Sequence, residues 1–192
     1  MPDDLPTLSF DTAADFETWL AEHHASSPGI WLKLRKKTPG GAAGFDYAQA
    51  LDVALCHGWI DGRKAAYDDR HWLQRFTPRR PDSAWSKVNR TKAEALIADG
   101  RMRPAGAAEI ERARADGRWA AAYDGMAGST VPDDLAAALA ANPAAAEFFA
   151  KLDGRNRYSV LYRVQTAKKA ETRQRRIEQY VAMLAEGRSI HP

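Results

Sequence analysis

The segment from Arg75 to Pro81, which reads Arg-Phe-Thr-Pro-Arg-Arg-Pro, combines residue types that are suited to binding an anion. Its two prolines fix the backbone φ angle and disfavour helix in the residue before each of them. We therefore expect Arg79 and Arg80 on a rigid, exposed turn. Guanidinium groups at such a turn can hold phosphate or carboxylate groups through paired hydrogen bonds.

A helix is expected directly after this segment, because Asp82 or Ser83 can cap a helix that carries Trp85. The N–H groups at the start of such a helix would add partial positive charge beside the arginines, and Trp85 would form a stacking wall. The sequence predicts an anion-binding cleft formed by Asp61, Arg75, Arg79, Arg80, Trp85 and Lys87. The alternative is structural, with the arginines paired to nearby aspartates and Trp85 in the core.

Asp61 precedes Gly62 in the sequence Trp59-Ile-Asp-Gly62, and two roles are open for it. Its carboxylate can orient an arginine or hold a ligand in the cleft, or it can fix the turn itself. Contact with Arg75 depends on the connection between two expected strands, because strand side chains alternate between the two faces of a sheet. An odd connection places both residues on one face, and an even connection separates them.

Local motifs of the common enzyme classes are absent from the sequence. It contains no Gly-rich phosphate loop, no Gly-x-Ser-x-Gly segment and no zinc-binding pattern of cysteines or histidines. Cys56 and His57 are adjacent, but neighbours on a helix point about 100° apart and do not form a catalytic pair. We therefore predict a non-catalytic binding protein with no catalytic residue, metal or cofactor. The alternative is an enzyme that acts on a small anionic substrate at the same cleft.

The charge of the chain favours anionic partners. Its 192 residues carry a formal net charge of +3, and the basic residues crowd the middle and the end. Nucleic acid is one such partner but is not favoured, because the aromatic residues among the arginines also have the spacing of a core. A third interpretation treats the basic last helices as a docking surface for a protein or a membrane face.

The expected location is the cytoplasm. No apolar run approaches the roughly 20 residues that a membrane-spanning helix needs. The acidic, proline-containing N-terminus differs from a secretory signal, which begins with basic residues followed by a continuous apolar stretch. The single cysteine, Cys56, permits no internal disulfide, which agrees with a reducing compartment.

The sequence predicts an α+β protein, with a small sheet and packed helices in front and a helical module behind. Thr12 and Asp15 approximate a capping box, Ile30 to Arg35 alternates as a strand does, and Gly58 is placed to end a helix. The expected front elements are a helix over residues 12–25, a strand over 30–35, a helix from Asp46 to Gly58, and a hairpin with strands 59–67 and 71–77.

Helices dominate after Pro81. Gly100 can close the first of them, Pro104 can open the next, and Pro132 and Pro143 suit first helical positions, the latter with Asn142 as its cap. The glycines between Tyr123 and Thr130 are typical of a linker. We predict two domains, an α+β domain over 1–124 and a helical module over 131–192.

Several motifs together resemble the bacterial YdeI/OmpD-associated family, also called bacteriocin-protection proteins. They are Leu55 to Gly62, Arg75 to Pro81, Trp85 to Asn89 and Asp116 to Trp119, with a C-terminal part from Val131 to Lys169 that is similar to the OmdA module of that family. The resemblance implies a role in stress or bacteriocin protection, and it carries over no reaction, cofactor or catalytic residue.

Two positions depart from the family pattern. His57 stands where an aromatic residue is usual, which makes the residues beside the Trp59 motif more polar. Ala170 stands where a proline often breaks the chain, so we expect that the last two helices can run together.

Overall fold

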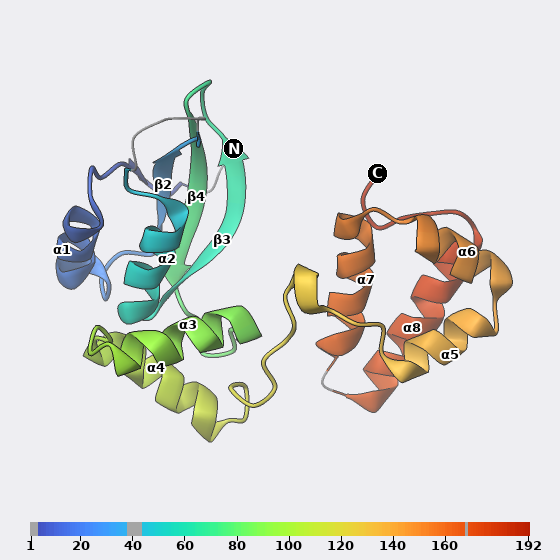
Figure 1. Ribbon diagram of the computed structural model, residues 1–192. Helices are drawn as coiled ribbons and strands as arrows, with labels where there is room; N and C mark the ends of the chain where they lie inside the picture. The colour runs from blue at the N-terminus through green and yellow to red at the C-terminus, as the bar shows by residue number, and fades with distance from the viewer. Residues whose placement is uncertain (1–3, 38–43, 168) are drawn as a thin grey trace. The chain divides into compact units, whose positions relative to one another are not determined.

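The structure is a computed structural model that describes residues 4–37, 44–167 and 169–192 (Figure 1). The chain forms two compact units. The first contains the residues up to Trp85 together with Asn89–Ala121, and the second contains Ser86–Val88 together with Ala122–Pro192. A sheet with helices forms the first unit and helices form the second, so the predicted α+β class is confirmed. Over the described residues, no helix combines the length and the apolar character that crossing a bilayer requires.

A four-stranded sheet with the order β1-β2-β4-β3 is the centre of the first unit. β1 runs parallel to β2, whereas β4 is antiparallel to both of its neighbours. The predicted strand and hairpin are confirmed. The pairing of β1 was not predicted, because two residues are too few to show a periodicity. The strands are β1 (Thr7–Leu8), β2 (Ile30–Arg35), β3 (Trp59–Ala66) and β4 (His71–Pro78).

Two helices with the predicted caps pack against this sheet. α1 (Ala13–His23) begins with a capping box between Thr12 and Asp15, and α2 (Tyr47–Cys56) begins with one between Asp46 and Gln49. Each box satisfies two N–H groups that a helix start leaves without partners. Gly58 follows α2 with a φ of 74°, a left-handed conformation that favours glycine.

Aromatic contacts show which face of the sheet the two helices cover. Phe16 of α1 lies 5.9 Å from Phe76 of β4 between ring centroids, and Tyr47 of α2 lies 6.1 Å from Trp72. Since strand side chains alternate, Trp31 and the other residues that pair with the odd-numbered positions of β4 point to the opposite face. The sheet therefore has one helix-covered face and one opposite face.

The helix expected after Pro81 begins later than predicted. α3 spans Lys87–Ala98, so Asp82 and Ser83 do not cap it and Trp85 precedes it. The reason is a turn in which the Ser83 N–H donates to the Arg80 carbonyl (3.0 Å) and the Arg80 N–H donates to the Ser83 hydroxyl (2.9 Å). The N–H and the hydroxyl of Ser83 are thus both bonded to Arg80. The predicted end at Gly100 and start at Pro104 are confirmed, with α4 spanning Pro104–Ala115.

The second unit consists of four α-helices and a short 3-10 helix among its described residues. Asn142 caps α6 as predicted, through a hydrogen bond from the Ala145 N–H (3.1 Å). Its core is built from Leu135, Leu139, Ala145, Phe149, Val160, Leu161, Val164, Ile177, Tyr180 and Leu184. The elements are η1 (Met126–Gly128), α5 (Asp133–Ala140), α6 (Pro143–Lys151), α7 (Gly154–Gln165) and α8 (Ala170–Ala185).

The last two helices are separate, and the expectation that they run together is wrong. α7 ends at Gln165 because other groups satisfy the carbonyls of its last turn. The Thr166 hydroxyl donates to the Tyr162 carbonyl (2.7 Å), and Arg173 of α8 donates to the Val164 carbonyl (2.9 Å). The absence of proline at position 170 is therefore not sufficient to join the helices.

The segment predicted as a linker is tied to the second unit at its start. Asp124 accepts hydrogen bonds from Lys87 (2.7 Å) and Gln165 (3.0 Å), and its backbone carbonyl accepts one from the Tyr158 hydroxyl (3.2 Å). The hydrogen bond from Lys87 is the largest of the influences that hold the pKa of the Asp124 carboxyl below its usual range. The predicted domain limits, 1–124 and 131–192, stay predictions, because compact packing does not test independent folding.

Candidate functional site

Arg79 is buried, and the expectation that it lies exposed is wrong. Its side chain is 5% exposed, and its guanidinium carbon lies 3.5 Å from the ring centroid of Trp85. It also donates a hydrogen bond to the Ala84 carbonyl (3.3 Å). A guanidinium in such an apolar contact stabilises the fold by cation–π attraction, by up to about 2 kcal/mol when desolvated. Arg79 thus fixes the loop that follows β4.

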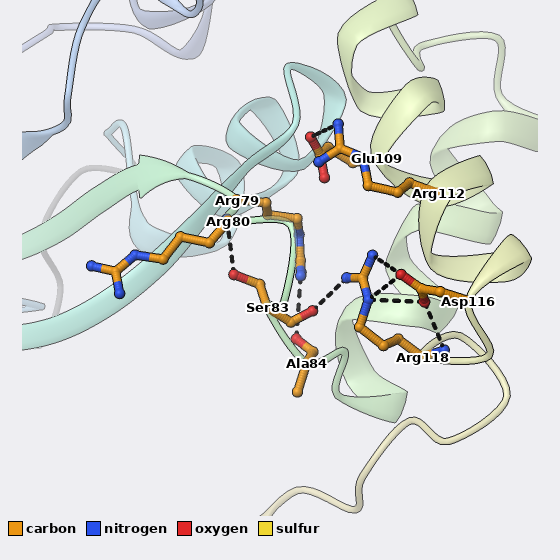
Figure 2. Close-up of polar contacts among 8 residues, drawn as sticks. All are labelled: Arg79, Arg80, Ser83, Ala84, Glu109, Arg112, Asp116 and Arg118. Atoms are coloured by element: carbon orange, nitrogen blue, oxygen red, sulfur yellow. Dashed lines mark hydrogen bonds and ion pairs between the residues drawn. The ribbon is translucent and has the colours of Figure 1, made fainter.

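A second buried arginine holds the same loop from the turn that follows α4 (Figure 2). Arg118 donates to the Ser83 carbonyl (2.7 Å), next to the carbonyl that Arg79 binds, and its Nε donates to both carboxylate oxygens of Asp116 (2.9 and 2.8 Å). We call Arg79, Arg118 and the segment 80–84 the arginine-bound loop. Its two buried arginines bind backbone of the chain itself.

The other cations of the predicted cleft have different surroundings from this pair. Arg80 is exposed, and Figure 2 shows its side chain pointing away from Arg79. Lys87 belongs to the second unit, where its ammonium group lies 2.7 Å from the Asp124 carboxylate. Arg79 and Trp85 are therefore the members of the predicted set that the structure brings into direct contact, and binding of an anion by the set stays a prediction.

The strand register shows that Asp61 and Arg75 point to opposite faces of the sheet. Asp61 pairs with Phe76, so its side chain is on the helix-covered face, whereas Arg75 is on the opposite face. The Tyr47 hydroxyl donates to Asp61 (2.8 Å), and burial together with the nearby carboxylate raises the pKa of Tyr47. Asp61 thus anchors α2 to the sheet and does not orient Arg75.

A β-bulge in β3 determines which side chains join the opposite face. Two residues, Gly62 and Arg63, lie opposite the single residue Arg75, and the pairing shifts between Asp61 and Lys64. The fully buried amide of Gln74 donates to the Gly62 carbonyl (2.8 Å) and thereby satisfies backbone at the bulge. The bulge directs Arg63 over the ring of Trp31, 5.4 Å from the ring centroid.

The opposite face of the sheet is cationic. By the strand register it presents Lys33 and Arg35 from β2, Arg75 and His71 from β4, and Arg63 from the bulge. The described strand positions on this face include no aspartate or glutamate. We call this surface the basic sheet face, and it consists of Lys33, Arg35, Arg63, His71 and Arg75.

One end of the basic sheet face is hollowed. A cavity of about 360 Å³ lies where Lys33, Arg35 and His71 meet the segment that follows β1. Its lining is completed by Ser9, Phe10, Asp11, Gly44 and Phe45. The cationic side chains and the Ser9 hydroxyl can hold a carboxylate or a phosphate group, and the Asp11 carboxylate opposes them. His71 also contacts Asp68 in the hairpin turn (2.9 Å).

The sequence contained part of the signal for this surface. The alternation from Ile30 to Arg35 places Lys33 and Arg35 on one face of a strand. The predicted binding site was nevertheless placed at the arginine-rich segment from Arg75 to Pro81. Arg63 could not be placed, because a single extra residue in β3 reverses which side chains share a face.

Two family models match the chain. Residues 8–109 match one described as Domain of unknown function (DUF8412). Residues 129–187 match one described as Bacteriocin-protection, YdeI or OmpD-Associated (OmdA). The first match includes β2, β3 and β4 with the helices that cover them, and the second includes α5 to α8. No curated protein and no solved structure matches the chain.

Proposed function

We propose that the chain, which belongs to the family of DUF8412 domains, binds an anionic partner through the basic sheet face. A YdeI/OmpD-associated (OmdA) domain follows the DUF8412 domain along the chain. The OmdA match supports a function related to bacteriocin protection. We propose that the chain contributes to this protection by binding its partner without catalysing a reaction. The observation that carries the proposal is the row of cations on one face of the sheet.

The charge distribution supports this surface over the predicted cleft. On the basic sheet face, Lys33, Arg35, Arg63 and Arg75 are cationic at neutral pH and come from three neighbouring strands. Like charges that share one face raise the local concentration of an anionic partner and speed its association. In the arginine-bound loop, by contrast, the guanidinium groups of Arg79 and Arg118 already bind backbone carbonyls.

The proposal is tested by removing two charges from the hollowed end of the surface. We expect Lys33→Gln combined with Arg35→Gln to weaken binding of inorganic polyphosphate or poly-glutamate about ten-fold at low salt. The reason is that two positive charges that attract the anionic probe are removed. Fluorescence anisotropy with labelled probes measures the affinity. Polyphosphate and poly-glutamate distinguish a phosphate partner from a carboxylate partner.

A matched control separates local recognition from net charge. Arg155→Gln combined with Arg175→Gln removes the same charge from exposed positions of α7 and α8. We expect this variant to bind within about two-fold of the unchanged protein when all variants are also compared at about 0.15 M salt, where charges more than about 8 Å from the probe are largely screened. Equal losses in both variants, or a loss only in the control, would contradict the proposal and favour the last helices as the docking surface.

A further inference from the structure

A second cavity in the first unit lies on the far side of α1 from its buried residues. It has a volume of about 620 Å³, within the range of pockets that hold small molecules. One stripe of α1, the C-terminal end of α2 and the first residues of α4 form its walls. The lining residues are Ala14, Glu17, Thr18, Ala21, Glu22, His24, His57, Arg103, Pro104 and Ala105.

His57 is a buried polar residue in the lining of this cavity. It follows α2 directly and is 5% exposed, and its Nε2 has no hydrogen-bond partner among the described residues. A buried polar atom without a partner is uncommon and points to a ligand or a water. Burial is the main reason that the pKa of His57 lies below its usual range, and the His24 ring, whose centroid is 5.7 Å away, lowers it further when it is protonated. The cavity is thus lined by a neutral imidazole at pH 7.

Two side chains of the cavity wall use their donors within α1 and keep acceptors. The Thr18 hydroxyl donates to the Ala14 carbonyl (2.9 Å), so its oxygen lone pairs remain. His24 Nδ1 lies 2.9 Å from the Leu20 carbonyl, which can only accept, so in the neutral ring the proton is on Nδ1 and Nε2 is an acceptor.

The charged pair at the rim contributes an acceptor as well as the N–H groups of Arg103 that lie outside the pair. Two guanidinium nitrogens of Arg103, Nε (3.1 Å) and Nη2, donate to the same oxygen of Glu17, which leaves the second carboxylate oxygen as an acceptor. Glu22 adds a further carboxylate, so Glu17, Glu22 and Arg103 sum to a formal charge of −1. The cavity is therefore rich in acceptors and weakly anionic, in contrast to the basic sheet face.

We propose that this cavity binds a small organic amine, with its ammonium group toward the acceptors of Thr18, His24 and the rim carboxylates. The walls at Ala14, Ala21 and Pro104 are apolar and accommodate a compact hydrocarbon body. This inference is independent of the basic sheet face, because the two sites share no residue.

Two probes with the same apolar body and opposite charge test the proposal. Phenethylamine carries an ammonium group and 3-phenylpropanoate carries a carboxylate. Imidazole signals of the full-length protein are followed by NMR during titration with each probe. We expect phenethylamine to shift the signals of His24 and His57 and to leave those of His71 and His191 unchanged. We expect 3-phenylpropanoate to bind at least five-fold more weakly, because the rim charge favours a cation.

Cavity and control variants locate the binding. Ala21→Leu at an exposed position fills the cavity and should abolish the shifts, whereas Ala182→Leu at an exposed position of α8 should leave them intact. Glu22→Gln should weaken phenethylamine about three- to five-fold, as loss of one partly exposed charge does. The proposal fails if 3-phenylpropanoate binds equally well, if all histidines shift together, or if Ala21→Leu binds phenethylamine unchanged.

Discussion

Arg79 and Arg118 in the arginine-bound loop are buried and donate to backbone carbonyls, whereas Lys33 and Arg35 lie on a sheet face together with three further basic residues. Both regions are rich in basic side chains, but Arg79 and Arg118 of the loop are buried, whereas those of the sheet face are partly or fully exposed. In the loop each guanidinium has bonds within the chain that hold residues 80–84. On the sheet face the strand register places five basic residues on one surface, where their charges share one sign. The comparison shows that arginines that are close in sequence character can have quite different surroundings in the fold.

The largest expected effect is on stability, from the loop. Arg79→Ala should lower the free energy of unfolding by about 2–4 kcal/mol, because it removes the contact with Trp85 and leaves the Ala84 carbonyl without its hydrogen bond. Urea denaturation measures the change. Arg80→Ala is the matched control, and as an exposed neighbour it should change stability by less than about 0.5 kcal/mol. Similar effects of both substitutions would remove the distinction drawn between buried and exposed arginines.

The bulge in β3 should give the next largest effect. Gln74→Leu keeps the volume but removes the hydrogen bond to the Gly62 carbonyl, and we expect a loss of about 1–3 kcal/mol. Because the bulge directs Arg63 over Trp31, polyphosphate binding by the folded variant should weaken as well. Unfolding and binding are measured on the same preparation. Unchanged binding in a folded variant would show that the bulge does not position the basic sheet face.

Arg63 itself should affect binding more than stability. Arg63→Ala removes the cation from the cation–π contact with Trp31 on the sheet face. We expect this to lower the free energy of unfolding by about 0.5–1 kcal/mol. Affinity for polyphosphate should fall several-fold, and the slope of log affinity against log salt should become shallower. A stability loss as large as that of Arg79→Ala, with binding intact, would assign Arg63 to the structure alone.

The smallest effect is expected from breaking the ion pair between Asp134 and Arg173 in the second unit. Arg173 binds Asp134 (2.6 Å), and its hydrogen bond holds the pKa of that carboxyl below the usual range. The stabilisation is present above the ordinary pKa of aspartate and is lost as pH falls through the lowered folded value. Since both groups are partly exposed, Asp134→Asn should cost less than about 1 kcal/mol at pH 7, and the cost should shrink as pH falls below the ordinary pKa of aspartate. Equal costs above and below this pKa would exclude the ion pair as the cause.

Local signals in the sequence predicted most elements of the fold. The capping boxes at Thr12 and Asp46, and the glycine at position 58, act within a few residues and therefore fixed helix boundaries correctly. The start of α3 was placed too early, because Ser83 can serve a turn or a cap and the sequence does not rank the two.

The candidate site depended on contacts between distant segments. Arg79 is buried by Trp85 and the loop is held by Arg118, a residue that the sequence does not link to it. The basic sheet face required the register of three strands and one bulge. Both follow from tertiary packing, which residue types and spacing alone do not determine.

The most direct test of the central claim is a map of polyphosphate binding by amide NMR on the full-length, ¹⁵N-labelled protein. We expect the largest shift changes at Lys33, Arg35 and His71 and their strand neighbours, fading as salt increases. The amides of α7 and α8 should change little. Shifts concentrated on those two helices, or around the arginine-bound loop with the basic sheet face unaffected, would contradict the account.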